Sequence, residues 1–221
     1  MYKDIKSGPD KIKKDWLFIL ENLLVFKNLV EDAKTNFKEL SECLVLAQKL
    51  SNQFDYFKSK YNIPNKVISE EEFRAKKEER DIVYQNLYKI FDGLQIKEIV
   101  NYIHKAIADN LTKYEIYVNG LADLSKKEWL EMLDLRDNLK ILYDEFEIWQ
   151  GKWQGEQAKE EFDLKDKLVQ ELLGYDNLLK EYFKKTDKEE LKWLKEEAED
   201  RLIPKPDGSQ RYDFWWRQEK S

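Results

Sequence analysis

The chain has 221 residues and a net charge of −6; 38% of its residues are charged, and only seven Gly and four Pro occur. This composition excludes collagen-like repeats, Pro- and Gly-rich disorder and β-sandwiches with many tight turns, and it favours long helices. The acidic balance disfavours sequence-independent nucleic-acid binding as the main task, because such domains are usually basic, although a local basic patch stays open. Only six of the 39 basic residues are Arg, which fits the AT-rich coding sequence of a low-GC bacterium, its phage, a mobile element or an AT-rich eukaryote.

The single cysteine, Cys43, excludes an internal disulfide and fits a reducing compartment. It lies between two leucines of an apolar helical pattern, so we expect a buried small side chain. The most apolar segment, residues 11–26, is interrupted by Glu21 and Asn22 and is too short to span a bilayer. We therefore expect a cytoplasmic protein with no membrane partner.

A long helix is predicted at the start of the chain, because residues 10–62 contain neither Gly nor Pro. Apolar residues recur there at alternating spacings of three and four from Trp16 to Tyr61, which is typical of a helix that packs in coiled-coil fashion. We expect one coiled-coil-like helix over about residues 10–61. The alternative is two collinear helices with a break near residues 32–35.

The first half of this helix, residues 16–30, is apolar on nearly every side, since Leu17, Leu24 and Val25 join the spaced series. A helix that is apolar all round is normally surrounded by other helices. We therefore expect this half to lie inside a bundle.

Capping-box sequences at residues 69–72, 125–128 and 186–189 predict the starts of later helices. The first of them predicts an antiparallel hairpin with a solvated tip at about residues 58–80. Gly120 predicts the end of a helix that begins near Ile96.

The expected fold class is all-α, a bundle of five to seven helices. The bundle is expected to occupy residues 1–203. An irregular, aromatic C-terminal tail is expected over residues 204–221, because the segment around Pro206 breaks the helical pattern.

The sequence lacks the usual parts of a catalytic or metal site. One His and one Cys exclude a zinc site with His/Cys spacing, and no Glu stands three residues before His104, as a di-iron helical bundle requires. The closely spaced glycines of a phosphate-binding loop are missing as well. Paired acidic residues are common but are typical of solvated helix faces. We predict no catalytic residue, no metal site and no cofactor.

Two aromatic segments are candidate partner-binding sites. Trp149 and Trp153 belong to a doubled WQG sequence and share one helix face, so they form either a platform for a ligand or peptide, or core where two helices meet. The tail interleaves aromatic residues with Arg, and it either straps its own bundle, docks a protein partner or contacts nucleic acid. Its candidate binding residues are Arg211, Tyr212, Phe214, Trp215, Trp216 and Arg217.

The leading interpretation is a non-enzymatic helical interaction protein, an adaptor, scaffold or inhibitor that binds another macromolecule, in the first place a protein. A second interpretation is a nucleic-acid-associated accessory protein. A third is a carboxylate-dependent enzyme with a divalent metal. The sequence does not specify the partner or the oligomeric state. The second interpretation requires one lysine-rich face, for which the candidates are Lys11, Lys13, Lys14, Lys184, Lys185, Lys188, Lys192 and Lys195.

Overall fold

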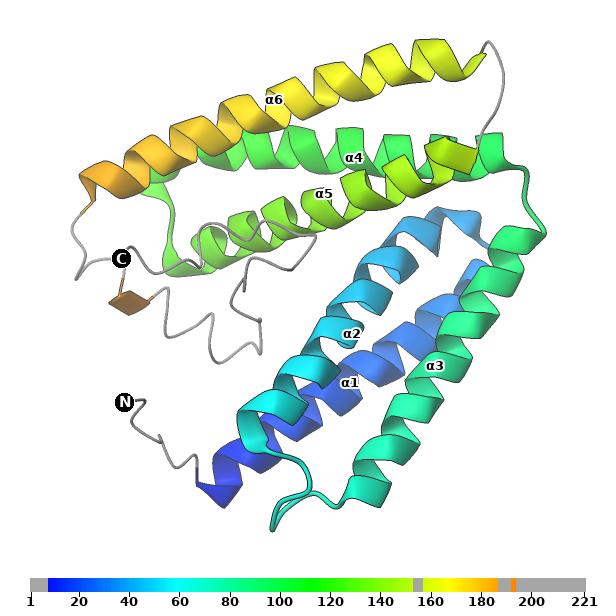
Figure 1. The fold of residues 1–221 in the computed structure, drawn as a ribbon. Helices are drawn as coiled ribbons and strands as arrows, with labels where there is room; N and C mark the ends of the chain where they lie inside the picture. Colours follow the sequence, from blue (N-terminus) through cyan, green and yellow to red (C-terminus); the bar gives the residue numbers. More distant parts are fainter. Residues whose placement is uncertain (1–7, 153–156, 187–191, 194–221) are drawn as a thin grey trace. The chain divides into compact units, whose positions relative to one another are not determined.

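A computed structural model of the chain describes residues 8–152, 157–186 and 192–193 (Figure 1). All secondary structure in these residues is helical, with six α-helices, two short 3-10 helices and no strand. The predicted all-α class and the predicted number of helices are therefore confirmed.

The described residues fall into two compact units. Residues up to Ile90 belong to the first unit, and the described residues from Phe91 onward belong to the second. The sequence predicts one bundle domain over residues 1–203, and this domain boundary stays a prediction. The predicted tail, residues 204–221, lies outside the described residues.

Three helices build the first unit: α1 (Pro9–Ala33), α2 (Leu40–Tyr61) and most of α3 (Glu70–Asp92), which lie side by side in Figure 1. Proline at the first position of α1 suits a helix start, because its missing N–H has no intrahelical partner there. The apolar residues that the sequence spaces three and four apart between Trp16 and Tyr61 form most of the core of this unit. Its fully buried side chains include Ile19, Phe26, Leu40, Leu50, Phe54, Phe57 and Leu87.

The expectation of one helix over residues 10–61 is corrected by the structure, because α1 ends at Ala33 and α2 begins at Leu40. Between them the chain turns back, so that α1 and α2 pack against each other as a hairpin. The backbone N–H groups of Thr35 and Asn36 both donate to the carbonyl of Asp32, at 3.1 and 2.9 Å, and close the turn. Apolar spacings of three and four fit one continuous helix and also two helices packed as a hairpin, because each helix of a hairpin buries one face.

The predicted end of α2 and start of α3 are confirmed. Asn62 follows α2 in the left-handed conformation (φ 49°) that often ends a helix. The hydroxyl of Ser69 accepts the backbone N–H of Glu72 at 3.0 Å, as a capping box requires. The expected solvated tip is smaller than predicted, because Phe73, within its range, is buried in the core with 2% of its surface exposed.

The second unit contains α4 (Ile96–Asn119), α5 (Lys126–Lys152) and α6 (Gln157–Lys185), with α6 running alongside α4 in Figure 1. Gly120 ends α4 as predicted. The Ser125 capping box is also confirmed: its hydroxyl accepts the N–H of Glu128 at 3.4 Å, and the Glu128 carboxylate accepts the N–H of Ser125 at 2.8 Å. The third predicted box, residues 186–189, lies outside the described residues after Thr186.

Hydropathy along the helices bears on membrane insertion. In the part of the chain that the structure describes, no helix is both long and apolar enough to cross a bilayer.

Candidate functional site

The outer side of α1 carries exposed apolar side chains. Leu17 and Leu24 are each 58% exposed and Val25 is 50% exposed. Leu17 and Leu24 are seven residues apart, which is about two helical turns or 10.5 Å, so they lie on the same side of the helix. We call this side the outer face of α1. Its exposed residues are Asp10, Lys13, Lys14, Leu17, Glu21, Leu24, Val25, Asn28, Glu31 and Asp32.

The opposite side of α1 is buried in the first unit, with Trp16, Ile19 and Leu23 each at most 4% exposed. The expectation that residues 16–30 lie inside a bundle is therefore right for one side only. A unit of three helices covers only one side of each member, so apolar residues on the other side stay exposed.

An aromatic cluster fixes the start of α1. The Trp16 ring lies 5.2 Å from the Phe57 ring, 5.8 Å from the Phe73 ring and 5.9 Å from the Phe54 ring. Its indole N–H donates to the Glu72 carboxylate at 2.9 Å. Trp16 thus joins α1 to both α2 and α3, and the outer face is held in one orientation.

Polar contacts fix α1 at two further points. The buried Asp15 carboxylate accepts a hydrogen bond from the Tyr61 hydroxyl at the end of α2, and the Lys60 ammonium lies 3.4 Å from it. Farther along, Lys27 donates to Glu79 of α3 at 2.7 Å. Hydrogen bonds from Lys27 and then from Lys76 lower the pKa of Glu79.

The outer face of α1 carries charges of both signs near its start and acidic charges near its end. Asp10, Lys13 and Lys14 lie near the start, Glu31 and Asp32 lie near the end, and the last turn of α1 contains no basic residue. Helix dipoles favour acidic residues at the start and basic residues at the end, so Asp10 suits the dipole and the other four do not. The neighbouring α2 follows the rule, because Lys58 and Lys60 stand in its last turn.

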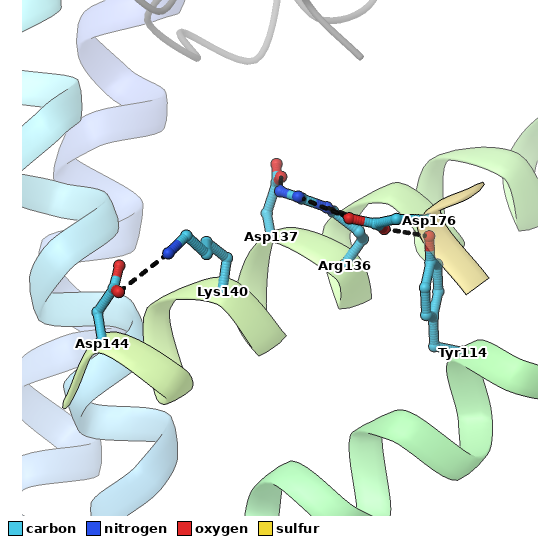
Figure 2. Close-up of polar contacts among 6 residues, drawn as sticks. All are labelled: Tyr114, Arg136, Asp137, Lys140, Asp144 and Asp176. Carbon is cyan, nitrogen blue, oxygen red and sulfur yellow. Dashed lines mark hydrogen bonds and ion pairs between the residues drawn. The ribbon is translucent and has the colours of Figure 1, made fainter. Parts of the chain in front are cut away.

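A second group of polar residues is buried in the second unit and joins its three helices (Figure 2). Arg136 of α5 donates to Asp176 of α6 at 2.9 Å, and the hydroxyl of Tyr114 of α4 donates to the same carboxylate at 3.0 Å. Asp137 of α5 lies 3.9 Å from the Arg136 guanidinium. We call these four residues the buried polar cluster, since none is more than 3% exposed.

The pKa shifts of Tyr114 and Arg136 suit a cluster that holds helices together and does not transfer protons. Burial, and then the Asp176 charge, raise the pKa of Tyr114. Burial alone would lower the pKa of Arg136, but Asp176 and Asp137 outweigh it and raise the pKa. Both groups therefore keep their protons near neutral pH, and neither is suited to transfer a proton there. Lys140 and Asp144 form a separate ion pair along α5 at 3.0 Å (Figure 2).

The predicted partner-binding residues are only partly described. Trp149 is 6% exposed; its ring lies 5.2 Å from the Phe91 ring, and the Lys152 ammonium stands 3.9 Å from the centre of the Trp149 ring. Trp153 and the six tail residues predicted to bind a partner lie outside the described residues. Whether these residues bind a partner stays a prediction.

The lysines proposed for a nucleic-acid surface lie in different parts of the structure. Lys13 and Lys14 are exposed on α1 in the first unit, and Lys184 on α6 in the second unit pairs with Glu181 at 2.6 Å. Lys188 and Lys195 are not among the described residues. Whether these lysines form a nucleic-acid surface stays a prediction.

The described residues were also compared with the side-chain clusters that hold metal ions in proteins. Across the described ranges, no cluster of three or more His, Cys, Asp or Glu side chains is arranged to hold a metal ion. His104 is half-buried, with its ring 6.2 Å from that of Phe146.

Comparison with protein families, curated proteins and solved structures finds no match to this chain.

Sequence reasoning assigned the outer face of α1 to the core. A signal for it exists in the sequence: Leu17 and Leu24 repeat the seven-residue spacing of Trp16 and Leu23, one position later. Two such parallel series on one helix point about 100° apart, so a helix in a small bundle buries one series and exposes part of the other.

Proposed function

We propose that this chain is a non-enzymatic helical interaction protein of the cytoplasm, which acts as an adaptor, scaffold or inhibitor by binding another macromolecule through the outer face of α1. The observation that carries the proposal is the exposure of Leu17, Leu24 and Val25 on a helix whose opposite side is fixed in the first unit. Burial of such side chains against a partner is favourable by about 25 cal/mol for each Å² of apolar surface removed from water.

The spacing of these residues suits a helical partner or a groove. Anchors two turns apart, with a third beside the second, match the positions by which amphipathic helices are recognised. Exposed Lys and Glu side chains surround the apolar residues, as at the polar rim of many protein interfaces. We therefore expect a protein partner rather than a nucleic acid.

A capture experiment tests the proposal. The tagged chain and its Leu17→Gln/Leu24→Gln variant are each incubated with an extract of the native host, and the captured proteins are identified by mass spectrometry. A matched control is Ile82→Gln, because Ile82 lies on α3 of the same unit and is also 58% exposed. We expect the double variant to lose at least 90% of the captured partner, while the control keeps it. Capture that survives the double variant contradicts the proposal.

The predicted tail is included in the same experiment as a separate variant that lacks residues 204–221. A tail that docks the partner is required for capture but not for the melting temperature. A tail that straps its own bundle lowers the melting temperature when it is removed. Strapping and protein docking, two of the three predicted roles of the tail, therefore give opposite results.

A further inference from the structure

We infer that two copies of this chain exchange their α1 helices, because the turn between α1 and α2 can open into helix. Residues 34–39 straighten, α1 and α2 join into one helix over residues 9–61, and each α1 packs against α2 and α3 of the other copy. The partner surface is therefore the one that α1 already occupies within the single chain. The inference does not rest on the proposed function, since the outer face of α1 takes no part in it.

The backbone of the turn is already close to helical. Lys34, directly after α1, has φ −62° and ψ −27°, and Glu39, directly before α2, has φ −78° and ψ −9°. Both lie in the right-handed helical region. Among the described residues, the one non-Gly residue with positive φ is Asn62, which follows α2 and lies outside this turn. The turn also contains no Gly or Pro, so few backbone angles change when the helix continues.

The hydrogen bonds that close the turn are local to it. The Thr35 hydroxyl and the backbone N–H groups of Thr35 and Asn36 donate to the Asp32 carbonyl, and the Asn36 amide donates to the Glu39 carboxylate at 3.1 Å. The Glu39 side chain accepts no capping hydrogen bond from α2. In a continuous helix, the first N–H groups of α2 gain carbonyls at the end of α1 as partners, which replaces the bonds lost from the turn.

The contacts between α1 and α2 fit an antiparallel pair of continuous helices. The Trp16 ring lies 5.2 Å from the Phe57 ring, and the Asn22 amide donates to Gln53 at 3.2 Å. The midpoint in sequence of each pair falls between residues 36 and 38, inside the turn. A two-fold axis at this point places the same residues opposite each other, one from each copy. The exchanged interface therefore repeats the contacts of the single unit, charged pairs included.

The apolar residues keep their helical spacing through the turn. Val30, Ala33, Phe37 and Leu40 follow one another at spacings of three and four. Three of them are buried, at most 1% exposed, whereas Phe37 is 36% exposed. In a continuous helix Phe37 lies on the same side as the other three, and the two-fold axis brings it beside Phe37 of the other copy. The exchange thus buries apolar surface that the hairpin leaves in water.

Refolding from urea at increasing protein concentration, followed by size-exclusion chromatography, tests the exchange. We expect a dimer whose fraction grows with concentration, because it forms from two chains. Thr35→Ala/Asn36→Ala should raise the dimer fraction by about fivefold or more, because alanine favours the helix and removes side-chain contacts that close the turn. Phe37→Pro should abolish the dimer, because proline interrupts a continuous helix.

Two control variants accompany this experiment. Asn110→Ala/Thr112→Ala makes the same replacements within α4 and removes side-chain hydrogen bonds to backbone carbonyls, at 2.7 and 3.0 Å. Leu17→Gln/Leu24→Gln changes the outer face of α1, which lies outside the exchanged interface. Both should leave the dimer fraction unchanged. A dimer that persists in Phe37→Pro joins through another surface and overturns the inference.

Cross-linking identifies an exchanged dimer directly. Lys27 donates to Glu79 at 2.7 Å within one chain, so in an exchanged dimer the two positions meet across the two chains. Lys27→Cys chains and Glu79→Cys chains are refolded together and treated with a short bismaleimide. We expect a covalent pair with one chain of each kind, and none from either variant alone. The native Cys43 is fully buried, and burial raises the pKa of its thiol to about 12, so it does not compete.

The outcomes also separate this inference from the proposed function. A wild-type chain that refolds only to a monomer at every concentration overturns the inference, as does a dimer that gives no cross-link between the two kinds of chain. Neither result bears on the proposed function, which fails only when capture of a partner survives the substitution of Leu17 and Leu24.

Discussion

At the scale of single residues, the buried polar cluster is the most unusual feature of the second unit. Burying a charge is costly unless it is paired, and the Arg136 guanidinium is matched by carboxylates from two helices. Apolar residues alone would hold α4, α5 and α6 together without specifying their alignment. One carboxylate that accepts from both Tyr114 and Arg136 fixes where α6 lies along the other two helices.

We predict that Asp176→Asn destabilises the protein by about 3 kcal/mol or more, because it removes the main counter-charge of a buried guanidinium and keeps the shape of the side chain. Urea unfolding followed by circular dichroism measures the effect. Glu181→Gln is the matched control on the same helix; Glu181 pairs with Lys184, both side chains are more than half exposed, and we expect a loss below about 1 kcal/mol. Similar losses for the two variants would show that the Arg136–Asp176 contact is not needed for stability.

At the scale of the helices, the sequence allows a break near residues 32–35 only between collinear helices, and it does not predict that the chain turns back between α1 and α2. The turn contains no Gly or Pro, and the apolar spacing continues through it, so periodicity alone favours a continuous helix. What ends α1 is local and polar: the Thr35 hydroxyl and the Thr35 and Asn36 backbone N–H groups all donate to the Asp32 carbonyl. Side-chain contacts of this kind compete with the helix but leave only a weak sequence signal.

A pair of proline substitutions distinguishes the two arrangements. Gln48→Pro lies within α2 and should cost about 3 kcal/mol or more, because it removes a helical hydrogen bond and clashes with the preceding turn. Phe37→Pro lies at the start of the short 3-10 turn and should cost less than half as much. The measurement is the free energy of unfolding in urea. Equal losses would indicate a helix that continues through residue 37.

The helix ends that could be predicted from the sequence are those set by capping side chains or by residues that favour a left-handed or open backbone. The Ser69 and Ser125 capping boxes, the stop at Asn62 and the end at Gly120 all lie where the sequence indicates. The capping box at Gln95, with Glu98, was missed because Gln rarely caps a helix start. The candidate site was missed for another reason: whether Leu17 faces core or solvent depends on how many helices surround α1, which no local pattern specifies.

At the scale of the whole molecule, both units bury groups that lose a proton only at alkaline pH. In the first unit, burial and then the nearby Glu39 and Glu42 raise the pKa of Cys43 to about 12. In the second unit, burial raises the pKa values of Tyr114 and Tyr143. In the unfolded chain these groups ionise at their ordinary pKa values, near 8.5 for Cys and 10 for Tyr.

The sign of the resulting pH dependence follows from these shifts. Below the unfolded pKa, both states hold the proton and stability does not change. Above it, the unfolded chain releases protons that the folded chain retains, so the free energy of unfolding falls by at most about 1.4 kcal/mol per pH unit for each group. We therefore predict a plateau in stability near neutral pH and a progressive loss between about pH 9 and 11.

Urea unfolding at pH 7, 9, 10 and 11 checks the prediction, and Cys43→Val identifies the contribution of the thiol, because valine fills a similar space and does not ionise. We expect the variant to lose stability less steeply than the wild type between about pH 9 and 10, where the Cys thiol of the unfolded chain is more fully ionised than its Tyr side chains. Leu44→Val is the control for altered packing beside the thiol; it should lower stability at every pH and leave the steepness unchanged. If Cys43→Val and the wild type lose stability in parallel over this range, the buried thiol does not contribute to the alkaline response of the first unit.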